Sequence, residues 1–167
     1  MTQTDLVQLL EQSRRKTNEL VEAIAKSTDP AAVLGWRPGP GRAHIAWQLM
    51  HIAATDDRHL NTRMRPGEAA APQFVQRFAG GSTPDDDVPS LDVIRGYLNE
   101  RRQAMLDQLR SLRDADLPTK ANPQAQWTYE EWFRVLAWHE AHHHGQAHLT
   151  YNLYRAANDS AAPKVGH

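Results

Sequence analysis

Residues 128–157 read TYEEWFRVLAWHEAHHHGQAHLTYNLYRAA, and their pattern predicts one long helix around which the fold is organised. Thr128 followed three residues later by Glu131 is a capping-box pattern, which marks the first turn of a helix. Side chains that share one direction at about 100° per residue predict the face that packs inward. They are Trp132, Val135, Leu136, His139, His142, His143, Gln146, Thr150, Leu153 and Tyr154.

Five of the nine histidines of the chain lie in this helix, and the helical period sorts them into two groups. His144 and His148 point away from the predicted inward face. His139 and His143 are four residues apart, a spacing that places two imidazoles on neighbouring turns and lets both bind one divalent ion. His142 is a rival partner for His139, and histidines that only pack or form hydrogen bonds would give the same pattern. A third ligand elsewhere in the chain is needed to decide.

The composition sets bounds on the function. A chain of 167 residues is expected to form one domain. Its net charge of −1 gives no positive electrostatic potential that would attract nucleic acid. The basic runs at residues 14–16 and 101–102 are predicted to lie on solvated helix surface. The chain has no cysteine, which excludes disulfides and a thiol nucleophile of its own. The N-terminal residues lack signal-peptide features and no apolar stretch has membrane-spanning length, so we expect a cytoplasmic protein without membrane partners.

Three further helices are predicted over residues 4–26, 42–64 and 91–114, each with an apolar stripe and each ended by proline, glycine or a turn. Ser90 is the predicted N-cap of the third of them. Residues 65–90 form a long connection in which residues 74–78 are expected to make a short helical turn over the bundle. Four helices with one long connection indicate an all-α four-helix bundle. We expect a single domain over residues 1–157 and an irregular tail over residues 158–167.

The predicted helix at residues 42–64 has a polar stripe as well as an apolar one. The stripe consists of His44, Gln48, His51, Thr55, Arg58 and Thr62. Two interpretations compete: a solvated face, or the polar wall of an internal cavity. Periodicity alone favours the solvated face, because His51 lies well outside the apolar arc.

Arg101 interrupts the apolar stripe of the helix at 91–114, where it shares a direction with Ile94, Leu98 and Met105. A guanidinium there must be paired or reach water, because burying it alone is costly. One interpretation is a salt-bridged arginine, or one whose head group extends to solvent. The other is an anion-binding group in the same cavity as the histidines, which would suit a carboxylate-bearing substrate.

Two segments of the chain resemble the DinB superfamily. Residues 139–146, HEAHHHGQ, resemble the signature of its closing helix, in which His-x-x-x-His is followed by a basic residue and Gly-Gln. Residues 43–53, AHIAWQLMHIA, resemble its second helix, where a histidine follows an apolar turn. The order and spacing of the predicted helices also fit that family over essentially the whole chain. His144 stands at the family's basic position, a departure that leaves the predicted ligands unchanged.

The resemblance implies a fold and a site. Proteins of this superfamily are four-helix bundles with up-down-down-up topology, so the connection at residues 65–90 would be the crossover between the second and third helices. They are commonly homodimers. Their metal is held by one histidine of the second helix and two of the fourth, which correspond here to His51, His139 and His143. This assignment brings His51 inward, against the periodicity.

The resemblance also implies a chemistry. The superfamily includes S-transferases and isomerases that use a low-molecular-weight thiol such as bacillithiol or mycothiol. Three neutral imidazoles leave an open coordination position, as catalytic metal sites do. We therefore expect a metal-dependent enzyme that activates such a thiol for attack on a small electrophilic substrate. The ion would be divalent, and Zn, Ni, Fe and Mn all accept imidazole.

His142 and Arg101 are the candidate catalytic residues beside the expected metal. Related bundle domains in ergothioneine biosynthesis carry an acidic residue two positions after the last ligand; Gly145 stands there in this chain, which argues against that chemistry. One alternative is a metal-dependent hydrolase with Glu140 or His142 as general base. Another is a non-catalytic, dimeric, stress-associated bundle that binds metal.

Overall fold

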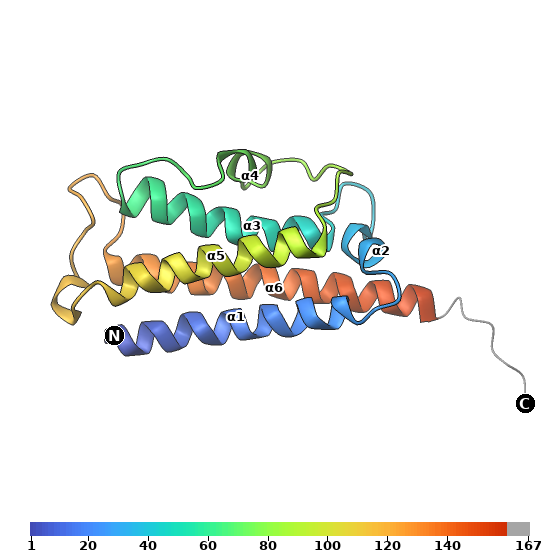
Figure 1. The fold of residues 1–167 in the computed structure, drawn as a ribbon, viewed down its shortest axis with the longest axis horizontal. Helices are drawn as coiled ribbons and strands as arrows, with labels where there is room; N and C mark the ends of the chain where they lie inside the picture. The colour runs from blue at the N-terminus through green and yellow to red at the C-terminus, as the bar shows by residue number, and fades with distance from the viewer. Residues whose placement is uncertain (160–167) are drawn as a thin grey trace, which may run out of the picture.

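Four long helical segments run side by side in the computed structural model, which describes residues 1–159 (Figure 1). The first, third and fourth of them are the continuous α-helices α1 (Gln3–Ala25), α5 (Leu91–Arg110) and α6 (Tyr129–Asp159). The second is α3 (Ile45–Arg58), which continues as the π-helix η1 (His59–Met64). Helices α1 and α3 each pack against both α5 and α6. The described residues contain no β-strand, so the all-α prediction is confirmed.

The direction of each helix follows from the colours of Figure 1. Helices α1 and α6 run from left to right, and α3 and α5 run from right to left. The connection between α3 and α5 therefore returns along the length of the molecule. It contains the short helix α4 (Pro72–Arg77), which packs on α3, as expected for residues 74–78.

The helix ends show which local signals decided the boundaries. Thr128 and Glu131 form the predicted capping contacts at the start of α6, since Thr128 N donates to the Glu131 carboxylate at 2.8 Å and Glu131 N donates to Thr128 Oγ1 at 3.3 Å. Ser90 caps α5 by accepting a hydrogen bond from Val93 N. Helix α5 ends at Arg110, earlier than residue 114, and α6 continues to Asp159. The tail was expected at residues 158–167. Residues 158 and 159 belong to α6, and residues 160–167 lie outside the described residues.

One helix was not predicted. Helix α2 (Pro30–Gly35) follows the Asp29-Pro30 pair that we expected only to end the first helix. Asp29 accepts a hydrogen bond from Ala32 N at 3.0 Å, and Pro30 occupies the first turn, where its missing N–H costs nothing. The pair therefore starts α2, whereas α1 has already ended at Ala25. The remaining short element is the 3₁₀ turn η2 (Asp114–Asp116).

A layer of four buried charges divides the core, and each long helical segment contributes one side chain to it. Its members, here called the charge layer, are Arg14, Asp56, Arg102 and Glu140, with exposed fractions of 6%, 1%, 4% and 0%. One apolar cluster lies on each side of it. Arg14 Nε donates to Glu140 at 2.7 Å, Arg102 also donates to Glu140, and Arg102 lies 3.2 Å from Asp56. Both arginines belong to the basic runs predicted to be solvated, so that prediction is wrong for them.

The buried face of α6 is rotated relative to the predicted one. Glu140 and Phe133 are fully buried, whereas His142 and Leu153 are exposed. Because α6 packs against both α1 and α3, its buried arc is wide and includes the charge layer, which an apolar pattern does not reveal. Among the described helices, none combines the length and the apolar character needed to cross a membrane.

Candidate metal centre

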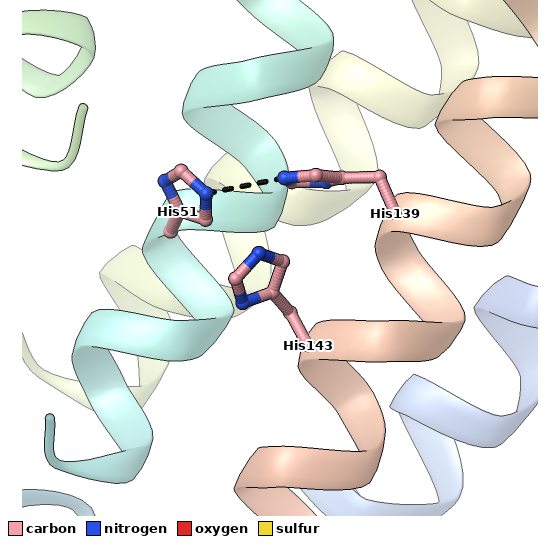
Figure 2. Close-up of side chains that lie close together, drawn as sticks. All are labelled: His51, His139 and His143. Carbon is pink, nitrogen blue, oxygen red and sulfur yellow. Dashed lines mark hydrogen bonds between the residues drawn. The ribbon is translucent and has the colours of Figure 1, made fainter. Parts of the chain in front are cut away.

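Three imidazoles from α3 and α6 converge on one space inside the bundle (Figure 2). His51 projects from α3, and His139 and His143 project from successive turns of α6. Each offers a ring nitrogen, and these nitrogens all lie within 4.8 Å of one another. His139 Nε2 and His51 Nε2 are 3.1 Å apart. The structure therefore brings together the three residues that the family resemblance implied, including the one that periodicity placed in solvent.

The crossover orients His51. Its Nδ1–H donates to the carbonyl oxygen of Phe78 at 2.6 Å, and Trp47 stacks on the ring with centroids 4.8 Å apart. A carbonyl oxygen can only accept, so the proton is on Nδ1 and the lone pair of Nε2 faces His139. Phe78 is itself buried against the bundle, which makes the long connection part of the site.

A chain of side-chain amides orients His143. Its Nδ1–H donates to Gln48 Oε1 at 2.6 Å, which leaves the lone pair of Nε2 free. Gln48 Nε2 donates to Gln146 Oε1 at 2.9 Å, and Gln146 Nε2 donates to His142 Nε2 at 2.7 Å. Exposed His142 is thus connected to His143 through two amides. Partners of this kind fix the tautomer of histidines that bind metals.

His139 is the least constrained of the three. Its Nδ1 is buried and has no hydrogen-bond partner among the described residues, and Thr55 Oγ1 lies 3.5 Å from its Nε2. Because Nε2 of His51 is an acceptor, Nε2 of His139 must carry the proton in the 3.1 Å contact between them. An ion in this space would replace that contact, with the proton moving to Nδ1.

The protein environment keeps all three rings neutral at pH 7. Burial, reinforced by the repulsion that protonated neighbouring imidazoles would exert, lowers the pKa of His139 to about 3 and that of His143 to about 4. Burial also lowers the pKa of His51, although its bond to Phe78 opposes the shift. A neutral imidazole is the form that binds a metal.

The donor set fits a divalent transition metal. Two imidazole nitrogens on one zinc ion at 2.0 to 2.1 Å in a tetrahedral site lie about 3.4 Å apart, close to the separation of the Nε2 atoms of His51 and His139. All three donors are neutral nitrogens, and the group contains no carboxylate. His51 is buried, while His139 and His143 are partly exposed, so a small molecule can approach from their side. His51, His139 and His143 would hold the ion.

Gln48 should affect metal binding without touching the metal. Replacing it by leucine keeps the volume but removes the acceptor of His143 Nδ1–H, and loss of such a partner typically weakens binding by about 10- to 100-fold. We expect that loss in Gln48→Leu when zinc affinity is measured by competition with a chelating dye. Gln146→Leu, which leaves the bond between Gln48 and His143 in place, should lose less. Equal affinities in the wild type and Gln48→Leu would contradict the assigned role.

The two candidate catalytic residues lie in different surroundings. His142 is exposed next to His143, with ring centroids 5.0 Å apart, and its other face is stacked on Trp138. Arg101 lies on α5, 3.5 Å from the Asp57 carboxylate and 3.7 Å from Glu100. Arg101 is therefore salt-bridged, as the first of its two interpretations predicted.

Asp57 is the residue that explains the position of Arg101. Its carboxylate is fully buried and accepts hydrogen bonds from Ala70 N, Ala71 N, Asn61 and Tyr97. Bonds from these donors hold its pKa below the ordinary value, although burial opposes that shift. Asp57 and Arg101 therefore anchor the start of the crossover to α3 and α5.

Fold and site together define a helical bundle with a three-histidine centre suited to a divalent metal. The chain belongs to the DinB superfamily, whose family model matches residues 9–147, a span that contains all three histidines. A search among curated proteins found no match. The family resemblance stated from the sequence is confirmed.

Proposed function

We propose that this protein is a metal-dependent enzyme that activates a low-molecular-weight thiol for attack on a small electrophilic substrate. The observation that carries the proposal is a cluster of three neutral histidines, with no carboxylate, in a chain of the DinB superfamily. The ligands are His51, His139 and His143, and the ion is divalent, with zinc, nickel, iron and manganese as candidates.

The charge of the site supports a thiol as the reactant. A divalent ion held by neutral ligands keeps its full positive charge and so stabilises the anionic form of a thiol over the neutral form. The protein's contribution is to hold three imidazoles in the required tautomers through Phe78 and Gln48 and to keep them unprotonated. The nucleophile must come from outside, because the chain has no cysteine.

His142 is the side chain we propose for proton transfer, because it is exposed directly beside His143 and accepts a hydrogen bond at Nε2. Arg101 is committed to Asp57, so we propose that it acts through the crossover, whose Phe78 carbonyl holds His51. In that role Arg101 positions a ligand and is not itself catalytic.

We also propose an up-down-down-up bundle that assembles as a homodimer in the cytoplasm, where small thiols stay reduced. The helix directions in Figure 1 support the topology. Trp138, Leu149 and Leu153 are exposed on a common side of α6, an apolar surface that a second copy would cover. Light scattering that gives the mass of a single chain would contradict the dimer.

Thiol consumption tests the proposed reaction. Protein prepared without a histidine tag and loaded with zinc, nickel or manganese is mixed with mycothiol, bacillithiol or cysteine and an electrophile such as monochlorobimane or chlorodinitrobenzene. We expect thiol loss above the uncatalysed rate with at least one combination. That excess should disappear in metal-free protein and in His143→Ala. Rates equal to background for every metal and thiol would refute thiol transfer.

The hydrolytic alternative has less support in the structure. Glu140, one of its two possible bases, is fully buried and bonded to Arg14 and Arg102, so it cannot reach a substrate. Burial opposes its ionisation, but the two guanidinium charges hold its pKa below the ordinary value. Hydrolysis would therefore rely on His142. Ester cleavage by the loaded protein, without thiol consumption, would favour that reaction.

A further inference from the structure

A second cavity lies where η1 meets the start of α6. It has a volume of about 590 Å³ and is lined by Arg58, by His59, Thr62 and Arg63 of η1, by residues 122 and 124–127 of the connection before α6, and by Trp132. We call it the Trp132 pocket. A volume of this size is within the usual range for small-molecule sites. None of the three histidines lines it, so it is distinct from the candidate metal centre.

The charge of the Trp132 pocket is positive. Arg58 and Arg63 both line it, and no aspartate or glutamate is among the described residues that do. Neither guanidinium forms an ion pair with the described residues, unlike Arg77, Arg95 or Arg113 elsewhere on the surface. Two unpaired guanidinium groups at one cavity are a ready-made partner for an oxyanion.

The walls of the pocket are aromatic and contain unused hydrogen-bonding groups. His59 packs on Trp132 with centroids 4.7 Å apart, and Trp127 packs edge-on against Trp132 at 4.6 Å. The Nε1–H of Trp132 and the Nδ1 of His59 are buried, yet neither has a hydrogen-bond partner within residues 1–159. Buried polar groups are normally paired, so two unpaired ones in a single wall call for a partner from outside the chain.

The backbone at the pocket is also unusual. His59–Met64 is a π-helical turn, and π-helical turns occur frequently at functional sites because their wider spacing redirects side chains. Here the turn presents His59, Thr62 and Arg63 together to the cavity. Burial lowers the pKa of His59 to about 4, and the charges of Arg58 and Arg63 add to that shift, so the ring is neutral beside two cations at pH 7.

From these observations we propose that the Trp132 pocket binds a small organic oxyanion, whose charged group meets Arg58 and Arg63 and whose planar apolar body lies against Trp127 and Trp132. The shared chemistry is a carboxylate or a phosphate ester on an unsaturated or aromatic body.

The position of the pocket suggests what the oxyanion is. His59 follows His51 by eight residues and Trp132 precedes His139 by seven, which corresponds to about 10 to 12 Å along each helix. A substrate long enough to cover that distance would reach the histidine centre from the pocket, and its oxyanion would then be its anchoring group. This last step rests on the proposed function; the binding of the anion in the pocket does not.

The test uses the metal-free full-length protein in EDTA, so that its outcome does not depend on the metal centre. The indole N–H signals of the five tryptophans are followed by two-dimensional NMR, with Trp132→Phe to assign the signal of Trp132. Benzoate and phenyl phosphate are the organic probes. Acetate and inorganic phosphate lack the apolar body, and benzamide lacks the charge.

We expect benzoate or phenyl phosphate to shift the Trp132 signal in a saturable manner, with benzamide, acetate and inorganic phosphate binding at least about 10-fold more weakly. The stronger of the two organic probes identifies the oxyanion. Arg58→Gln and Arg63→Gln should each weaken binding by about 10-fold, as for loss of a hydrogen bond to a charged group. Arg155→Gln makes the same charge change on exposed α6 surface outside the pocket and should leave binding unchanged.

Three results would overturn the proposal. One is a Trp132 signal that neither organic probe moves at tens of millimolar. Another is benzamide binding as tightly as benzoate, because the anion would then be irrelevant. The third is equal weakening by Arg155→Gln and the two pocket variants, which would reduce the effect to net charge.

Discussion

His143→Ala is expected to lose the stoichiometric metal that the wild type retains. A structural zinc site with four ligands has a binding free energy of roughly 10 to 16 kcal/mol, or about 3 kcal/mol per ligand. Losing one of the three histidines should therefore weaken binding by more than about 100-fold. The measurement is elemental analysis of untagged protein after dialysis, followed by zinc affinity from chelator competition.

His144→Ala is the matched control for that variant. His144 is the next residue of the same helix and is also half-buried, but it stacks on His148 and does not belong to the three-histidine group. It should retain wild-type metal content. If His143→Ala keeps its metal, or if His144→Ala loses as much, the three-histidine centre is not the binding site and the proposed function fails with it.

Much of the fold could be predicted from the sequence because the signals were local. The capping pair Thr128 and Glu131, the cap at Ser90 and the apolar stripes predicted the four long helical segments and the long connection between the second and the third. The extent of α5 was overestimated: Ser111 N makes the last i→i−4 bond, to Asp107 O, and Leu112 N already bonds to Leu109 O in a tighter turn. Helix α2 was missed although Asp29-Pro30 is a recognised start signal.

The site was harder to predict because its third ligand depends on contacts between helices. Periodicity describes a helix relative to its own apolar side, and it placed His51 in solvent. In the structure Gln48 and His51 of that polar stripe are buried against α6, and His44 is buried against the crossover, where its Nε2 lies 3.0 Å from Asp85 O. Only the family resemblance identified this. The carbonyl of Phe78 and the amide of Gln48 gave no signal of a role at all, because neither is recognisable before the packing is known.

The charge layer could not be predicted from periodicity either, because it also depends on contacts between helices. Periodicity treats an arginine as an outward residue, so Arg14 and Arg102 were placed on the surface. Glu140 was considered only as a possible general base, whereas in the structure it contacts both arginines. Each long helical segment contributes only one side chain to the charge layer, so the pattern of a single segment does not predict the layer. A charge in an otherwise apolar stripe is paired or costly, and the pairing partner lies on another helix.

Glu140→Leu should be one of the most destabilising single substitutions in this chain. It leaves Arg14 and Arg102 buried with only Asp56 to balance them, and removing one partner of a buried ion pair costs about 3 to 5 kcal/mol. Arg102→Leu should cost a similar amount, since Glu140 and Asp56 would then share a single guanidinium. Urea unfolding at pH 7 in EDTA measures both, and EDTA removes any contribution of bound metal through the neighbouring His139. Glu19→Leu, at an exposed ion pair with Lys16, should produce no measurable change.

The double variant Glu140→Leu/Arg102→Leu distinguishes a balanced charge layer from four independent contacts. It leaves Arg14 and Asp56, which lie 3.6 Å apart and sum to zero charge, and it fills the vacated space with apolar side chains. Apolar replacement of a buried ion pair is often neutral or stabilising, so the double variant should be more stable than either single one. The interaction free energy from this cycle should reach several kcal/mol. If the double variant instead costs the sum of the two single losses, the charges do not compensate one another, and the layer stabilises the bundle only through packing.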